Sequence, residues 1–500
     1  MMEHTQSRLE KLAERCAKTA TEYRISLWSS WLFGLAAYMF VFTNKLLNLD
    51  ELAGLFGKGE TVSSGRWGLS LTSFIFPDYS MPWINGLICI LLLSVSICLI
   101  IGIFEIKKPV LQVLLSGLII VFPSQAVTFA YMFTCAPYAL AVLFAVWSVY
   151  LTLKGGRGRY VCSIILLCLS AAIYQAYISV TVSLYVVFYI RQTLKNAEIK
   201  GIIRDGMRCI LAVVLSLVLY FAVNKAVMHL AAVEYNSYAT AAWNSDIKSI
   251  LGGIRVAFTA FFGYFLKGHY HLAPTVFSMA VHTLLAVVIA VPVVTWFIKC
   301  RDNARKILLL ALIIVFPLSV NCIYIISSQR HTLMLLSFTS VYVLAACLLE
   351  ELDFRRLRGA ALVCMGLILV CNIFYSNRLY LKMKLEYEEA YGFYSSIVTR
   401  VKSAEGYDND TMLIITGDAN ELVYHADEID TSDIVGLMEG LLNIYSRYDF
   451  LRYYIGYDYR PIDWDGWGAL NASDEVEKMP VFPYDGSVKK FGDYMVVKLG

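Results

Sequence analysis

Two adjacent carboxylates, Asp50 and Glu51, follow the first long apolar run of the chain in the stretch "NLDELAG". A carboxylate can take a proton from an attacking hydroxyl group, so both acids are candidate general bases. Adjacent residues of a helix point about 100° apart, so the two acids cannot both reach one atom. Asn48 has the spacing of a helix N-cap, with Glu51 reaching back to its amide. We therefore expect Asp50 to be the base and keep Glu51 as the second candidate.

Two arginines stand in short polar segments between apolar runs, Arg66 in "SSGRWG" and Arg330 in "SSQRHT". The planar guanidinium fork suits a phosphate group, so both are candidate phosphate contacts, and His331 is a candidate beside the second. Snorkelling toward the membrane surface is the alternative for Arg330. Trp67 is either a ring that stacks on a sugar or an ordinary interfacial tryptophan.

Weaker candidates occur in two further segments. Lys267 and His269 belong to "KGHYH", which ends with His271. An H-x-H pair could bind a metal ion. No third ligand is evident, so we expect no metal. Tyr174 and Gln175 belong to "YQAY", in the middle of an apolar region. Polar groups at membrane depth are expensive and often functional, although hydrogen bonding between helices explains them equally well.

The composition predicts the surroundings of the segments that carry these residues. Of 500 residues, 58% are hydrophobic and only 16% are charged, against about 25% charged in soluble domains. The mean hydropathy is +0.61. Membrane lipid is therefore the expected surrounding of much of the chain, and a net charge of +3 is too small to indicate a nucleic-acid partner.

The apolar runs predict a mainly α, polytopic membrane protein, because a helix needs roughly 20 apolar residues to cross a bilayer. The run 160–190 has basic segments on both sides, so we expect it to cross twice and turn near "YQAY". We expect 123–138, bracketed by prolines, to form a short interfacial or re-entrant helix and a helix within 229–274 to lie in the interface. Together with the hairpin, about eleven crossings are predicted, the others being 26–43, 84–104, 110–123, 137–153, 209–228, 275–298, 307–326, 332–350 and 359–378.

Basic residues predict the orientation, because lysine and arginine stay on the cytoplasmic side. The N-terminal segment 1–25 carries five of them and is expected in the cytoplasm, followed by a multi-span membrane domain, 26–379. Eleven crossings then put the C-terminus outside the cell membrane, together with loop 44–83. The composition changes near residue 380, and 380–500 is predicted as a small α/β domain, with strands in 411–420 and 493–500 and a helix over 432–446.

Four features in this order resemble one family: an acid pair in the first outward loop, "GRWG", "YQAYIS" in a central hairpin, and an outward C-terminal domain. Over 26–378 the chain resembles the GtrII-type glucosyltransferases, membrane proteins of the GT-C fold class. The resemblance implies transfer of glucose from a polyprenyl-phosphate-linked donor to a cell-surface glycan, such as an O-antigen or a wall polymer. It also implies inversion, often without a metal, and a catalytic acid in the first outward loop, which matches Asp50 or Glu51. We expect no cofactor.

Two other functions remain open from the residues. A transporter or flippase for lipid-linked sugars would show repeated halves and binding groups near the midplane, whereas these polar groups gather at one face. A glycan polymerase would share the outward cations. We therefore expect a hexosyltransferase, with a polyprenyl-phosphate-sugar donor and a glycan acceptor as its partners.

Overall fold

The computed structural model describes residues 21–500, except 58, 60, 77–78, 242–245, 269–274, 353–354, 418, 420–428, 432–433, 435, 438–439 and 458–463. The chain forms two compact units. The membrane unit comprises Met1–Asn44 and Gly57–Asn377, and the C-terminal unit comprises Lys45–Phe56 and Arg378–Gly500. The short segment Lys45–Phe56 thus belongs with residues more than 300 positions later, which the sequence does not predict.

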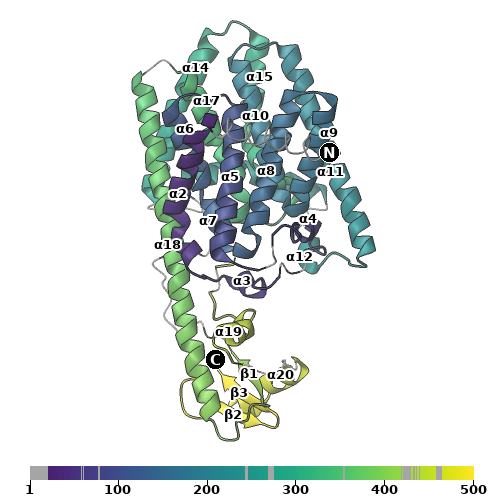
Figure 1. The fold of residues 1–500 in the computed structure, drawn as a ribbon, viewed down its shortest axis with the longest axis vertical. Helices are drawn as coiled ribbons and strands as arrows, with labels where there is room; N and C mark the ends of the chain where they lie inside the picture. Colours follow the sequence, from purple (N-terminus) through teal and green to yellow (C-terminus); the bar gives the residue numbers. More distant parts are fainter. Residues whose placement is uncertain are drawn as a thin grey trace, which may run out of the picture. The chain divides into compact units, whose positions relative to one another are not determined.

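The membrane unit is a bundle of helices (Figure 1). Among the described residues nine helices are long and apolar enough to span a membrane, or ten if the bent pair α6–α7 is one span. The prediction of a mainly helical, polytopic protein is confirmed, with nine to ten candidate spans in place of eleven. The nine are α2 (Arg24–Thr43), α5 (Pro82–Ile103), α8 (Met132–Lys154), α11 (Ile199–Leu230), α13 (Ile247–Lys267), α14 (Thr275–Lys299), α15 (Asn303–Val320), η2 with α17 (Thr332–Thr339 and Ser340–Glu351), and α18 (Arg355–Ser403).

The count differs because the predicted hairpin over 160–190 has short arms. α9 (Arg157–Ile173) and α10 (Ile178–Leu194) have 17 residues each and are separated by the single turn η1 (Gln175–Tyr177). The turn at "YQAY" is confirmed, but each arm is shorter than a usual span. Conversely, α13 qualifies as a span although the sequence places it in the interface. It packs against α14, α15 and α16 (Ile323–Ile326).

A break in the bundle lies where we predicted an interfacial or re-entrant helix bracketed by prolines. α6 (Pro109–Ile120) and α7 (Pro123–Ala130) meet at a bend of 43°. Every residue of α7 is buried, so this helix lies inside the protein. Such a break is tolerated at membrane depth because protein, and not lipid, surrounds it.

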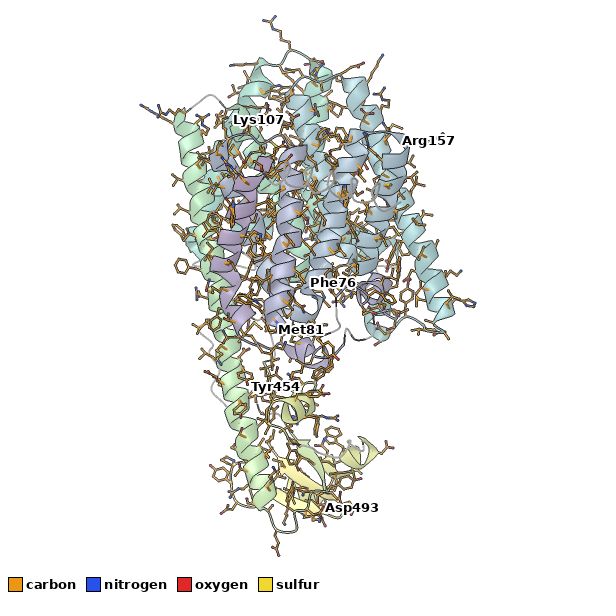
Figure 2. The ribbon with its side chains drawn as sticks, in the orientation of Figure 1. Phe76, Met81, Lys107, Arg157, Tyr454 and Asp493 are labelled. Carbon is orange, nitrogen blue, oxygen red and sulfur yellow. The ribbon has the colours of Figure 1, made fainter. Side chains whose placement is uncertain are left out.

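Four labelled residues identify the two ends of the bundle. Lys107 and Arg157 lie at one end, and Phe76 and Met81 lie at the other (Figure 2). At the second end, α4 (Trp67–Thr72) and α12 (Ser237–Ala241) lie near each other (Figure 1). The amide of Asn236 donates to Ser63 O at 3.1 Å and ties these two segments together.

The C-terminal unit contains a three-stranded sheet in the order β1–β3–β2. β1 (Met412–Thr416) is parallel to β3 (Tyr494–Lys498), and β2 (Val488–Phe491) is antiparallel to β3. Strands in 411–420 and 493–500 are therefore confirmed. The helix predicted over 432–446 is wrong for its described residues, which form turns, because Gly436 and Gly440 adopt positive φ angles of 82° and 64°. α19 (Arg447–Tyr453), α20 (Trp464–Asn471) and α21 (Asp474–Glu477) follow.

Alternation along the strands gives the sheet two buried faces. Ile414 and Val496 pack with Val476 and Met479 on one face. On the other face Leu413 and its neighbours pack with the last turns of α18 and with α19. Three leucines from α3 (Leu49–Ala53) and its flanks join this second core: Leu47, Leu52 and Leu55. These leucines explain why Lys45–Phe56 belongs to the C-terminal unit.

Candidate functional site

A small cavity of the membrane unit brings together four of the predicted site residues. It has a volume of about 60 Å³, well below the several hundred Å³ of a typical ligand pocket, so it can hold one polar group of a larger substrate. Eleven residues line it: Ser64, Arg66, Tyr174, Gln175, Ala176, Ala239, Ile323, Ser327, Gln329, His331 and Met334.

A hydrogen-bonded loop positions Arg66 at this cavity. The backbone turns at Gly65, whose φ of 74° favours glycine, and the amide of Arg66 donates to Thr61 O at 2.7 Å. Gly65 O then accepts from Gln175 Nε2 at 3.2 Å and from the Tyr220 hydroxyl at 2.9 Å. Gln175 Nε2 and Tyr220 also lie 2.9 Å apart. Gln175 therefore holds the arginine loop as well as lining the cavity.

The Arg66 guanidinium lies against aromatic rings. Its Cζ is 5.5 Å from the centroid of the Tyr174 ring, a cation–π distance. Its Nη1 donates to the Tyr138 hydroxyl at 3.5 Å, and Tyr138 stacks on Tyr174 with centroids 4.7 Å apart. Tyr177 packs edge-on against both tyrosines. These contacts with Tyr174 and Tyr138 restrain the position of the guanidinium.

His331 adds a neutral polar group to the same cavity. Burial and the nearby Arg66 guanidinium both lower the pKa of His331 below its usual value, 6.5. Its imidazole is therefore neutral at neutral pH and can both donate and accept a hydrogen bond. With Arg66, it makes a site with one positive charge, which suits an anionic group.

Sequence reasoning missed several lining residues. Ser64, Ser327 and Gln329 stand within three residues of the arginines in "SSGRWG" and "SSQRHT", so the polar composition of these two segments was the available signal. Tyr220 lies inside an apolar run, and only its hydrogen bonds reveal its part in holding the loop.

Trp67 lies in the protein core. It is 6% exposed and packs with Leu167, Cys168 and Ala171 of α9. A Cβ on the neighbouring Gly68 would lie 2.7 Å from the carbonyl carbon of Ala172, so α4 sits directly on α9. The ring therefore anchors the arginine loop to the short hairpin, and this arrangement offers no exposed face for stacking on a sugar.

The other predicted cations stand apart from the cavity lining. Arg330 is exposed and does not line the cavity, although both of its neighbours do. Lys267 is exposed at the last turn of α13. His269 and His271 lie outside the described residues, and within the described part of the chain no cluster of three metal-ligating side chains occurs.

The acids are located in the C-terminal unit. Asn48 caps α3, accepting from the Glu51 amide at 2.8 Å, so the predicted N-cap is confirmed. The Glu51 carboxylate is completely buried and forms an ion pair with Lys45. The amide of Leu49 donates to Gly436 O at 3.1 Å and joins α3 to the rest of the unit.

Asp50 differs from its neighbour in its surroundings. It is half-buried and lies close to Tyr445, a residue that is 64% exposed. Partial burial and the Asp50 carboxylate raise the pKa of Tyr445 above its usual value. A carboxylate must contact a substrate to act on it, and Asp50, unlike Glu51, has exposed surface to do so.

The fold defines a class, a multi-pass membrane protein with a cationic polar cavity in its helical bundle. A family model described as "Glucosyl transferase GtrII" matches residues 39–349, more than half of the chain. The chain belongs to this family, and it is a membrane glucosyltransferase. The match includes α3 and the whole Arg66 cavity and ends before α18. No curated protein and no solved structure matched the chain.

Proposed function

We propose that this glucosyltransferase moves glucose from a polyprenyl-phosphate-linked donor to a glycan of the cell surface, such as an O-antigen or a wall polymer. The observation that carries the proposal is the cavity in which Arg66 and a neutral His331 meet inside a membrane-spanning bundle of the GtrII family. A donor held in the membrane by its lipid can present a phosphate group to such a cavity, and guanidinium is the side chain that matches phosphate best.

The chemistry requires a cation where charge develops. As the acceptor hydroxyl attacks the anomeric carbon, a carbon–oxygen bond forms and the bond from that carbon to the phosphate oxygen breaks. The phosphate leaves with the electron pair and gains one negative charge. Arg66 is held by Tyr138 and Tyr174 before substrate arrives, so it stabilises this charge without reorganising. His331 can donate a hydrogen bond to the same oxygens.

The reaction also requires a base for the hydroxyl proton. Asp50 is our proposed base because it is half-buried, whereas Glu51 is enclosed and paired with Lys45. Tyr445, beside Asp50, offers an exposed aromatic ring against which an acceptor sugar can pack. One direct displacement inverts the anomeric configuration, in agreement with what the family resemblance implies.

The proposed orientation follows the basic residues. Lys107 and Arg157 mark one end of the bundle and are expected at the cytoplasmic surface (Figure 2). We propose that the N-terminus is cytoplasmic and that the C-terminal unit is outside. Arg66 directly precedes α4, which lies at the opposite end (Figure 1), and a flipped lipid-linked sugar would be available on that side.

The direct test uses the purified chain in nanodiscs with polyprenyl-phosphate-glucose and a candidate acceptor glycan. We expect glucosyl transfer that falls at least 100-fold in Asp50→Asn, the usual range for removing a general base. Glu51→Gln, the matched control, should lose less than tenfold. If both variants keep full activity, the assigned base is wrong. Translocation of the lipid-linked sugar without transfer would instead identify a flippase.

A further inference from the structure

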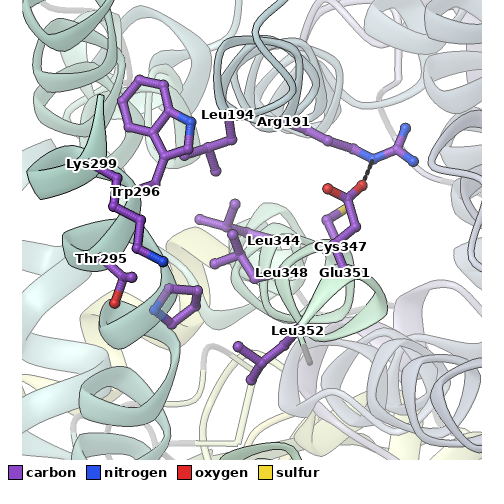
Figure 3. A pocket seen from close by; sticks show the side chains of 11 residues that line it. Arg191, Leu194, Thr295, Trp296, Lys299, Leu344, Cys347, Leu348, Glu351 and Leu352 are labelled. Atoms are coloured by element: carbon purple, nitrogen blue, oxygen red, sulfur yellow. Dashed lines mark ion pairs between the residues drawn. The ribbon is translucent and has the colours of Figure 1, made fainter. Parts of the chain in front are cut away.

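A second cavity of the membrane unit lies where α10, α14 and α17 end (Figure 3). Its volume is about 250 Å³. The segment that contributes Met334 to the Arg66 cavity contributes Leu344 to Leu352 here, ten or more residues later. At 1.5 Å per residue the separation along the helix is at least about 15 Å. The second cavity is therefore distinct from the proposed catalytic site.

The polar side of this cavity is built around a buried arginine. Arg191 is 6% exposed; its Nη2 contacts Glu105 Oε2 at 3.2 Å, and its Nε lies 3.6 Å from Glu351 Oε1. Nε has no hydrogen-bond partner among the described residues. Lys195 Nζ also pairs with Glu351 at 2.9 Å. The arginine is thus held in place by two carboxylates, one on each side of its guanidinium.

A second cation stands across the cavity. Lys299 and Trp296 lie on the side opposite Arg191, with Leu344 and Leu348 between them (Figure 3). Lys299 is exposed and forms no ion pair with any described residue. Among the residues that line the cavity, two cations, Arg191 and Lys299, therefore stand against one carboxylate, Glu351. The surplus charge is positive.

The remaining lining is apolar. Leu194, Pro292, Leu344 and Leu348 form its walls and floor. Trp296 is half-buried at the rim, and amphipathic rings of this kind favour the boundary between acyl chains and head groups. The cavity thus offers an apolar surface that suits an acyl chain, beside a cationic rim that suits an anionic head group.

We propose that this cavity binds an anionic phospholipid, with its phosphate between Lys299 and Arg191 and its acyl chain along Leu344 and Leu348. Basic pockets between membrane helices recognise acidic head groups in this way. The C-terminal ends of α10, α14 and α17 carry partial negative charge, and this charge is offset by part of the positive charge of the cavity. Lys299, on the exposed rim and without an ion-pair partner, supplies the charge that remains for the lipid.

The test uses the full-length chain, purified in mild detergent, stripped of lipid, and titrated with phosphatidylglycerol, phosphatidylethanolamine or phosphatidylcholine by native mass spectrometry. We expect one tightly bound phosphatidylglycerol, preferred at least fivefold over the two zwitterionic lipids. Lys299→Gln should weaken it about fivefold, because one basic residue near a membrane surface contributes about that factor. Arg157→Gln, an exposed cation of the same end outside the cavity, is the matched control and should change binding less than twofold.

A second variant, Leu348→Trp, fills the apolar part of the cavity without changing charge and should abolish the tight site for every lipid. Size-exclusion chromatography confirms that each variant is folded. Equal affinity for the three lipids overturns the proposal, as does equal weakening by Lys299→Gln and Arg157→Gln. Preferential displacement of phosphatidylglycerol by polyprenyl phosphate also overturns it, because the cavity would then hold the reaction's lipid. Each readout is a binding measurement, so loss of transferase activity does not bear on it.

Discussion

Two segments that are neighbours in the sequence, 45–56 and 61–72, acquire their structures from different partners. In the first, Leu47, Leu52 and Leu55 join the core of the C-terminal unit and thereby hold the acids. In the second, Gln175 and Tyr220 bind the loop that carries Arg66. The first segment is held by apolar burial, whereas the second is held by hydrogen bonds from Gln175 and from Tyr220 of α11, together with the packing of Trp67 on α9. The proposed base and the proposed phosphate contact are therefore positioned by separate units.

We expect the activity of the proposed base to depend on the apolar packing of α3 in the C-terminal unit. Leu52 is 1% exposed, and Leu52→Asp buries a charge in the second core. We expect transfer to fall at least 100-fold, as in Asp50→Asn, together with protease sensitivity of the C-terminal unit. Leu52→Met keeps the volume and should retain activity. Full activity in Leu52→Asp would show that the acids do not depend on this packing.

The other segment is tested at its cation. Arg66→Lys keeps the charge but removes the planar fork and the ring contact, so we expect transfer to fall about ten- to 100-fold, with the C-terminal unit intact. Arg330→Ala should have a smaller effect because Arg330 does not line the cavity. Steady-state transfer with varied donor concentration measures both. A larger loss in Arg330→Ala would shift the phosphate contact to the exposed arginine.

The close contact of α4 and α9 predicts an effect of substitution on the stability of the membrane unit. A Cβ on Gly68 would meet the backbone of Ala172 at 2.7 Å, so Gly68→Ala should destabilise the membrane unit by about 1–3 kcal/mol. Gly158→Ala is the control, because a Cβ there has nothing within 4 Å. Thermal unfolding in detergent compares them. Equal melting temperatures of the two variants would show that α4 and α9 accommodate the added Cβ without loss of stability.

The smallest expected effect concerns pH. The pKa of His331 is lowered in the folded protein, so the stability linked to this group is present above pH 6.5 and is lost as the pH falls through the folded value. We expect the melting temperature to decline below pH 6.5 more steeply in the wild type than in His331→Gln, whose side chain stays neutral. Parallel declines in both proteins would assign the pH dependence to other groups.

Local patterns predicted a good part of this molecule. The basic segments around 160–190 indicated the hairpin, and the spacing of Asn48 and Glu51 indicated the helix cap. Family membership also followed from short motifs in order. The turns at Gly436 and Gly440 were missed because apolar periodicity in 432–446 favours a helix, whereas positive φ angles prevent one.

The candidate site was only partly predictable. Arg66, Tyr174, Gln175 and His331 were candidates from residue type alone, and the structure brings them to one cavity. Trp67 was a candidate by the same reasoning, but it packs in the core because α4 lies on α9. Residue type shows what a side chain can do, whereas the neighbouring elements decide whether it faces a cavity.

The sequence by itself determined the membrane character, the helical bundle, the family and which residue types are present that can bind a phosphate or accept a proton. These follow from composition, periodicity and spacing, which are properties of short stretches. Only the tertiary structure decided that Glu51 is enclosed, that Arg66 and His331 share a cavity, and that Lys45–Phe56 belongs with the C-terminal unit. The physical reason is that each depends on contacts between distant residues, such as Leu52 with the core around Phe450.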